Sequence, residues 1–216
     1  MSEFRLNRFF SGPLTRLLLK TPLTPNQITL ISLGFGVLAG VLFSRGVYGF
    51  SIAAAVSYQL AAVLDNCDGE VARAKNMRSV FGGWLDIVAD ILSDLSLFLG
   101  VSFGVLRQET GGPVFLFMGL CLSGALMHFF LVILEKLKGF GPAVFEAPHP
   151  EHKRRKSIFL KIFDALREGD SSWFVVFFAL IGQVPMLLWA GGFYMQFIWV
   201  SALWINFRWT FGEKNK

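Results

Sequence analysis

Residues 65–90 read DNCDGEVARAKNMRSVFGGWLDIVAD and place two pairs of aspartates within strongly apolar surroundings. Asp65 and Asp68 are three positions apart and Asp86 and Asp90 are four apart, so each pair lies on one face of a helix. On insertion scales an aspartate near the centre of a bilayer costs about 2.5–3.5 kcal/mol, which argues against a passive structural role for all four. A cation bound jointly by the carboxylates would compensate for this cost.

The composition of the chain is typical of a membrane protein. Of its 216 residues 54% are hydrophobic and 16% are charged, whereas a soluble domain carries about 25% charged residues. The net charge is +5, and the basic residues cluster at the ends of apolar runs. This pattern indicates contact with a membrane surface and argues against binding to nucleic acid. Cys67 and Cys121 lie in apolar stretches and form no disulfide framework.

Six segments are long and apolar enough to cross a hydrocarbon core of about 30 Å. They lie near residues 28–46, 49–73, 81–106, 113–136, 172–191 and 193–211. Gly191-Gly192 is expected to form a tight hairpin between the last two. The sequence therefore predicts an all-α integral membrane protein with one domain, residues 1–216. Its six-helix core would span residues 28–211, after an interfacial amphipathic helix within residues 1–24 that shows no signal-peptide cleavage site.

The distribution of basic residues predicts the orientation in the membrane. Of the 20 Lys and Arg residues, only Arg45 and Arg107 lie in the loops after the first and third segments. The positive-inside rule then places both termini in the cytoplasm of a multi-pass protein of the cell inner membrane or its equivalent. The four aspartates would lie on the same, cytoplasmic side. Residues 153–168 have the pattern of a second helix in the headgroup layer.

The connection at residues 74–80 is short enough for two antiparallel helices to bring the aspartate pairs together. Carboxylates are hard oxygen ligands, which suit Mg²⁺ or Mn²⁺ better than zinc. One ion is expected on Asp65, Asp68 and Asp86. A second ion is expected on Asp65, Asp86 and Asp90. Two cations a few ångströms apart are the usual clamp for displacement at phosphorus.

Small and polar residues beside the aspartates favour a substrate that carries phosphate. Gly69 and Gly82 allow close approach of a backbone, Arg73 can fork onto a phosphate, and Ser79 can donate to a phosphate oxygen. Taken singly, the glycines are also explained by helix packing and Arg73 by anchoring at the membrane surface. The prediction of a phosphate-bearing substrate therefore depends on their combination with the aspartates. Glu70 points away from Asp68 and is expected to be only a polar neighbour.

The complete pattern, D-x2-D-G-x2-A-R-x8-G-x3-D-x3-D, resembles the signature of the CDP-alcohol phosphotransferase family at all eight fixed positions. The segment Pro25-Asn26-Gln27-Ile28-Thr29 is also similar to the start of that family's first membrane helix. The resemblance implies transfer of a substituted phosphate from a CDP-linked donor to an alcohol, with CMP leaving. It implies that Asp65, Asp68, Asp86 and Asp90 bind the two ions. Asp90 would also take the proton of the attacking hydroxyl.

The resemblance further assigns residues to the two substrates. The CDP donor would be contacted by Asn26, Thr29, Gly69, Arg73, Ser79 and Gly82. Candidates for the acceptor are Lys136, Lys138 and Asp94. Alternatives stay open for these three: the lysines suit anchoring at the interface, and Asp94 suits a buried, hydrogen-bonded acid.

The sequence allows more than one interpretation of the donor and of the class of function. CDP-diacylglycerol as donor, with a small polyol or amino alcohol as acceptor, would place the protein in phospholipid biosynthesis. Alternatively, a soluble CDP-alcohol such as CDP-inositol would pass its headgroup phosphate to a lipid or polyol; Asn66, Cys67 and Glu70 resemble enzymes with inositol-type donors. A divalent-cation carrier would need access from both sides and often has paired repeats, which the one-sided acids do not favour. The resemblance and the apolar outer helices are consistent with a homodimer.

Overall fold

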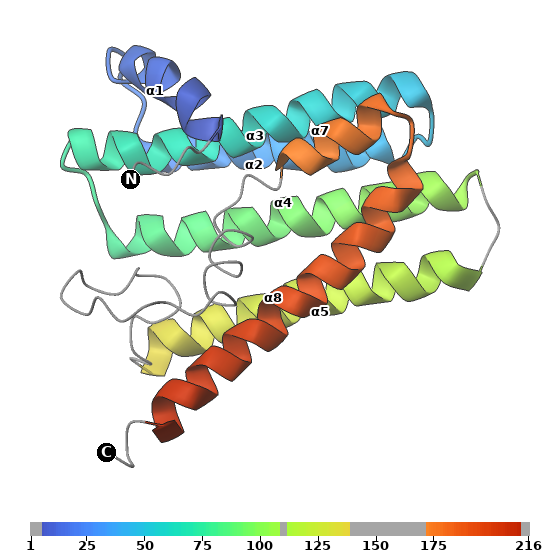
Figure 1. Cartoon of the computed structure of the whole chain (residues 1–216). Helices are drawn as coiled ribbons and strands as arrows, with labels where there is room; N and C mark the ends of the chain where they lie inside the picture. Colours follow the sequence, from blue (N-terminus) through green and yellow to red (C-terminus); the bar gives the residue numbers. More distant parts are fainter. Residues whose placement is uncertain (1–5, 109–111, 139–171, 213–216) are drawn as a thin grey trace. The chain divides into compact units, whose positions relative to one another are not determined.

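The computed structural model describes residues 6–108, 112–138 and 172–212, and every element in these ranges is a helix (Figure 1). The helices are α1 (Leu6–Leu18), α2 (Pro25–Phe43), α3 (Tyr48–Ala74), α4 (Val80–Leu106), α5 (Gly112–Lys138), α7 (Ser172–Leu180) and α8 (Val184–Gly212). The prediction of an all-α protein is confirmed for the described residues. The predicted interfacial helix within 153–168 lies outside them.

Four stretches in the described ranges have the length and apolar composition needed to cross a membrane. They are Pro25–Phe43, Val80–Leu106, Pro113–Leu134 and Val184–Ser201. Helix α3 has 27 residues and is long enough to cross, but it is not among the four and carries acidic side chains in its last third. The predicted total of six crossings therefore stays a prediction.

The last two predicted segments are divided differently in the structure. Helix α7 ends at Leu180, and Gly182 adopts a φ of +70° in the turn that follows. Helix α8 then continues without a break through Gly191-Gly192, so the predicted hairpin at these glycines is wrong. The reason is that a glycine pair only permits a turn. Gly182 adopts the left-handed conformation that ends α7, and Pro185 suits the first turn of the next helix.

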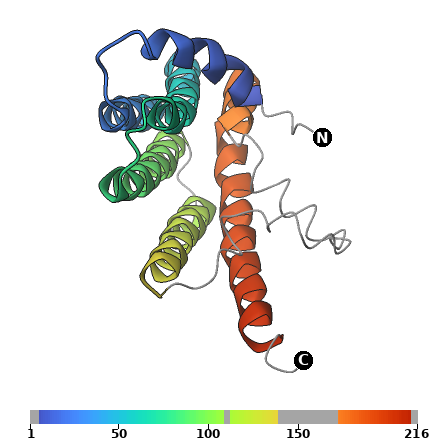
Figure 2. The ribbon, with the colours of Figure 1, turned by 90° about the vertical axis from the view of Figure 1, so that its left-hand side faces the viewer.

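The chain divides into two compact units. The first comprises the described residues within 1–118 and 170–189, and the second comprises those within 119–169 and 190–216. In the second unit Gln196 of α8 donates from Nε2 to the carbonyl oxygen of Leu120 at 2.8 Å. In the first, α2 packs on both α3 and α4, while α1 and α7 pack on α3. Figure 2 views α2, α3 and α4 nearly end-on, with α1 lying at an angle to them.

Helix α2 holds α3 and α4 in place through small residues and hydroxyl groups. A side chain at Gly40 would clash with Ser96 of α4, and one at Gly100 would clash with the Gly40 backbone. On the other side, Ser32 and Ser57 donate across the α2–α3 contact to the carbonyl oxygens of Ala61 and Phe35, at 2.9 and 2.8 Å. Small residues permit this close approach of helices in a membrane. Since α3 and α4 carry the aspartates, α2 sets the spacing of the site.

Candidate metal and substrate site

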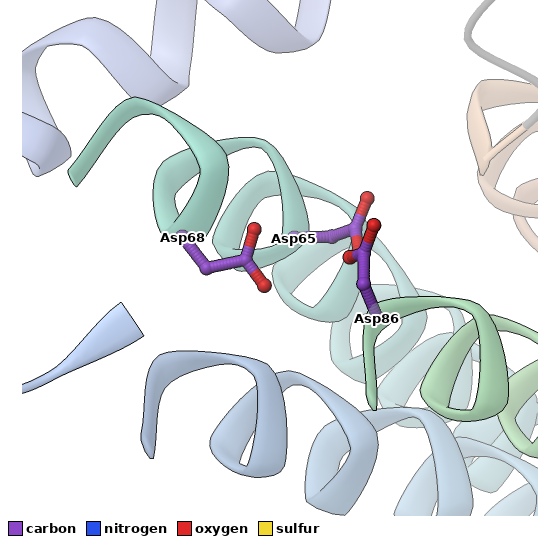
Figure 3. A group of neighbouring side chains, drawn as sticks. All are labelled: Asp65, Asp68 and Asp86. Carbon is purple, nitrogen blue, oxygen red and sulfur yellow. The ribbon is translucent and has the colours of Figure 1, made fainter. Parts of the chain in front are cut away.

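Three aspartate side chains converge from α3 and α4. Asp65, Asp68 and Asp86 each offer a carboxylate oxygen, and these oxygens lie within 4.8 Å of one another (Figure 3). Asp68 is buried and the other two are half-buried. Like charges at this distance repel unless a cation compensates them, and the all-oxygen ligand set fits a hard divalent ion. The cluster can therefore bind a metal ion, as the sequence predicts.

The fourth aspartate lies beside this cluster. Asp90 is one turn after Asp86 on α4, and its carboxyl group is within side-chain hydrogen-bonding reach of Asp65 on α3. Its side chain is accessible, whereas Asp68 is covered by its neighbours. The structure thus brings all four aspartates together and leaves Asp90 on the open side of the group.

A threonine from α2 bonds to the most buried of the three clustered aspartates. Thr29 Oγ1 lies 2.5 Å from Asp68 Oδ2 and 3.2 Å from the carbonyl oxygen of Pro25, and Thr29 is only 4% exposed. Partners of this kind orient a metal ligand and keep its charge in place. The sequence assigns Thr29 to the CDP donor. In the structure its hydroxyl is directed at Asp68, so its clearest role is to orient that carboxylate.

The starts of α2 and α4 lie side by side next to the aspartates. Thr24 and Gln27 form a capping box at the start of α2, and Ser79 Oγ accepts from the Gly82 amide at the start of α4 at 2.9 Å. A Cβ atom on Gly82 would lie 3.0 Å from Asn26 Oδ1 and 3.1 Å from Ser79 Oγ. Three predicted donor contacts, Asn26, Ser79 and Gly82, are therefore neighbours. Helix starts carry partial positive charge that favours phosphate groups.

The other two predicted donor residues lie on the last turns of α3. The Arg73 guanidinium folds back toward Gly69: a Cβ atom on that glycine would lie only 3.4 Å from Arg73 Nη1. The Arg73 side chain is exposed, while Gly69 directly follows the buried Asp68. Both residues are thus at the same end of the helix bundle as the aspartates.

The three candidate residues for acceptor binding have different outcomes in the structure. Asp94 Oδ1 accepts a hydrogen bond of 2.7 Å from the Tyr58 hydroxyl of α3. This contact favours the alternative of a hydrogen-bonded structural acid, one turn beyond Asp90. Lys136 and Lys138 belong to the end of α5, where the side chains lie outside the described residues, so their assignment stays a prediction.

Sequence reasoning missed the role of Glu70. It is more than a polar neighbour, since both its oxygens accept hydrogen bonds from α1, from Ser11 Oγ at 3.1 Å and Thr15 Oγ1 at 2.6 Å. The partners are 59 and 55 residues away along the chain. No local sequence pattern predicts a hydrogen bond between residues so far apart along the chain. The one available signal was the recurrence of polar residues at Ser11 and Thr15 within an otherwise apolar and basic helix.

Comparisons with known proteins identify the family of the chain. Residues 22–147 match the family described as CDP-alcohol phosphatidyltransferase. The chain is 31% identical over 125 residues to the bifunctional IPC transferase and DIPP synthase of Thermococcus kodakarensis, covering 56% of this chain and 26% of that protein. It is 38% identical over 91 residues to the phosphatidylinositol phosphate synthase of Corynebacterium glutamicum, covering 42% and 41%. The chain thus matches about two fifths or less of the length of these relatives.

The fold also has a counterpart among solved structures. It is similar to the crystal structure of the Mycobacterium tuberculosis phosphatidylinositol phosphate synthase with CDP-DAG bound, with a TM-score of 0.63, 91% of this chain and 92% of the other covered, and 21% identity. At this identity the similarity concerns the fold. The family match itself spans more than half of the chain and includes all four aspartates, Asn26, Thr29, Arg73 and Ser79. The chain is an integral membrane protein and belongs to the CDP-alcohol phosphatidyltransferase family.

Proposed function

We propose that this protein transfers a phosphatidyl group from CDP-diacylglycerol to a small alcohol and releases CMP, as a step of phospholipid biosynthesis. The observation that carries the proposal is the convergence of Asp65, Asp68 and Asp86, from two helices, within 4.8 Å. The names of the relatives support the choice of donor. The Corynebacterium relative is a phosphatidylinositol phosphate synthase, and the Mycobacterium enzyme of similar fold was crystallised with CDP-DAG.

The proposed cofactors are two divalent cations, Mg²⁺ or Mn²⁺. Asp65, Asp68 and Asp86 would hold one, and Asp65 and Asp86 would share the second with Asp90. When bound, such ions neutralise the charge on the transferring phosphate and on the leaving oxygen. Thr29 keeps the Asp68 carboxylate oriented for this task through its 2.5 Å hydrogen bond.

The remaining side chains bind the donor and move one proton. Arg73 can fork onto a phosphate of the CDP part. Asn26, Ser79 and Gly82, neighbours at the starts of α2 and α4, would contact the same part of the donor. Asp90 accepts the proton of the acceptor hydroxyl as the new oxygen–phosphorus bond forms. The bond between that phosphorus and the CMP oxygen breaks, and CMP leaves with the electron pair. General-base help of this kind contributes about 10²–10⁴-fold.

The surroundings of the site are part of the proposal. With the termini in the cytoplasm, the site faces the inner leaflet, where a nucleotide and a lipid can both reach it. We further propose that residues 1–216 work as one domain in a homodimer, with α1 in the headgroup layer.

The test is a donor and acceptor screen with the purified protein. CDP-diacylglycerol is combined with Mg²⁺ or Mn²⁺ and with inositol, inositol phosphate, glycerol 3-phosphate or serine, and CMP and lipid products are measured by mass spectrometry. We expect metal-dependent CMP release matched by one phosphatidyl product, and loss of both in Asp86→Asn or with excess EDTA. If no CDP-linked donor supports CMP release, the proposal fails.

A second candidate uses a soluble donor. The similarity of Asn66, Cys67 and Glu70 to enzymes with inositol-type donors favours transfer from CDP-inositol to a lipid or polyol. The name of the Thermococcus relative, bifunctional IPC transferase and DIPP synthase, also differs from that of a phosphatidyl synthase. The same screen with CDP-inositol decides between the donors. A cation carrier, the candidate from another class, would instead move Mn²⁺ into vesicles without any CDP-linked substrate.

A further inference from the structure

Helix α1 turns a polar stripe toward the rest of the first unit. Asn7, Ser11 and Thr15 recur every four residues and are 4%, 0% and 7% exposed, whereas Phe9 and Leu17 are 72% and 61% exposed. In a soluble protein the apolar face of such a helix would be the buried one. The exposed apolar face fits the headgroup layer of a membrane. The buried polar stripe needs hydrogen-bonding partners inside the protein.

Glu70 of α3 provides those partners at the end of the stripe nearest the aspartates. One of its oxygens accepts from Ser11 Oγ at 3.1 Å and the other from Thr15 Oγ1 at 2.6 Å. Beside it, the Cys67 thiol lies 3.6 Å from the carbonyl oxygen of Ser11 and is completely buried under α1. Both carboxylate oxygens of Glu70 are therefore committed to α1.

The same two turns of α3 carry residues of the proposed site. Asp68 precedes Glu70 by two residues and Arg73 follows it by three. Just beyond, Lys75 Nζ donates to the carbonyl oxygens of Thr21 and Leu23, at 2.8 and 2.9 Å, and so fixes the linker between α1 and α2. The end of α3 is thus held by α1 and by the linker that follows it.

This support matters because α3 and α4 meet mainly through side chains, Tyr58 with Asp94 and the aspartate cluster. The close helix pairs of the first unit are α2 with α3, α2 with α4, α1 with α3 and α3 with α7, and α3 with α4 is not among them. A substrate has to enter between the faces that carry the aspartates. The last turns of a helix open most easily when few contacts hold them. Helix α2 holds this part of α3 from one side, where Thr29 bonds to Asp68 and Ile28 packs with Val71. Contacts with α1 hold it from another side.

We propose that Glu70 is a positioning residue of the metal and donor site. It fastens α1 to the last turns of α3 and so fixes the helix segment from which Asp68 and Arg73 extend. Glu70 is not part of the carboxylate cluster, so it acts through the backbone of α3 and not as a ligand. The part of this inference that concerns donor binding rests on the proposed function. The part that concerns metal binding rests on the aspartate cluster alone.

Four variants test the proposal, each in a Cys121→Ala background so that Cys67 is the single thiol. Glu70→Ala and the double variant Ser11→Ala/Thr15→Val remove the contact from either side. Glu70→Gln keeps it, since an amide can accept from one hydroxyl and donate to the other. Gln59→Leu is the matched control. It breaks the 2.7 Å hydrogen bond from Gln59 to Asn7, in the same α1–α3 contact but 11 residues before Glu70, about 16 Å along the helix.

Four quantities are measured for each variant. They are Mn²⁺ affinity by electron paramagnetic resonance without donor, the labelling rate of Cys67 by a thiol reagent, the donor KM, and kcat. In Glu70→Ala and in the double variant we expect faster Cys67 labelling, with Mn²⁺ affinity about tenfold weaker, as for other residues that orient metal ligands. Donor KM should rise more than kcat falls. Combining the two variants should add little. Glu70→Gln and Gln59→Leu should keep Mn²⁺ affinity within about threefold of the unaltered protein.

The outcomes separate the alternatives. If Cys67 becomes accessible in Glu70→Ala while Mn²⁺ affinity and donor KM are unchanged, α1 is only a membrane anchor and the proposal is overturned. If Glu70→Gln loses as much Mn²⁺ affinity as Glu70→Ala without faster labelling, Glu70 acts by its charge, which also contradicts it. If the unaltered protein releases no CMP, the proposed function fails, and Mn²⁺ affinity with Cys67 labelling still decides the role of Glu70.

Discussion

Thr29 of α2 donates a 2.5 Å hydrogen bond to Asp68 of α3, and Thr29 is almost completely buried. This contact connects the helix that supports the site with the most buried of its proposed metal ligands. Helix α2 also packs closely on α4, which carries Asp86 and Asp90. One helix therefore sets both the spacing of the two aspartate pairs and the orientation of one carboxylate.

The first prediction concerns this hydroxyl. Thr29→Val keeps the side-chain shape and removes the donor, so Asp68 loses the partner that orients it. We expect the Mg²⁺ concentration for half-maximal activity to rise about tenfold. Thr29→Ser, which retains the hydroxyl, should stay close to the unaltered protein. Equal metal dependence in Thr29→Val and the unaltered protein would remove this role from Thr29.

Asp90→Asn separates catalysis from binding. The substitution removes the proposed proton acceptor but keeps the side-chain size, so turnover should fall by about 10²–10⁴-fold or more. Binding of CDP-diacylglycerol, measured by calorimetry in detergent, should remain detectable, because Asn26, Arg73 and Ser79 are unchanged. Full CMP release by this variant would exclude Asp90 as the base.

The contact between Tyr58 and Asp94 should stabilise the fold rather than serve the chemistry. Tyr58→Phe leaves the Asp94 carboxyl without the hydroxyl that now donates to it at 2.7 Å. Loss of a partner for a half-buried polar group costs about 1–3 kcal/mol. We expect a lower melting temperature in detergent with little change in donor KM. Replacing both residues, as Tyr58→Phe/Asp94→Leu, should recover part of the stability. A large change in acceptor KM in Tyr58→Phe would instead support an acceptor role for Asp94.

The α2–α4 contact can be tested with two glycines. A methyl group at Gly100 would clash with the backbone of Gly40, whereas one at Gly34 meets nothing within 4 Å. Gly100→Ala should therefore destabilise the protein by about 1–3 kcal/mol, the usual range for overpacking. Gly34→Ala should be neutral or stabilising by up to about 1 kcal/mol, because alanine favours a helix. Thermal melting of the two variants in the same detergent is the measurement, and equal melting temperatures would contradict this packing.

The aspartate cluster was predictable because its information is local. Asp65 with Asp68, and Asp86 with Asp90, share helix faces by spacing alone, and the short connection between them allows one antiparallel pair. The positions of the helices at Pro25–Phe43, Val80–Leu106 and Pro113–Leu134 follow from their apolar length in the same way. The break near Gly182 was missed, since Gly191-Gly192 looks like the stronger turn signal. Whether a glycine adopts a positive φ depends on the packing around it.

The sequence by itself therefore determined the class of the protein, the carboxylate set and the chemistry it suits, because residue type and helical period are enough for these. The tertiary structure decided which distant side chains form hydrogen bonds around the set: Thr29 with Asp68, Tyr58 with Asp94, and Ser11 and Thr15 with Glu70. The members of these pairs lie 36 to 59 residues apart along the chain. No periodic pattern links such distant positions, and hydrogen-bond geometry exists only once the helices have packed.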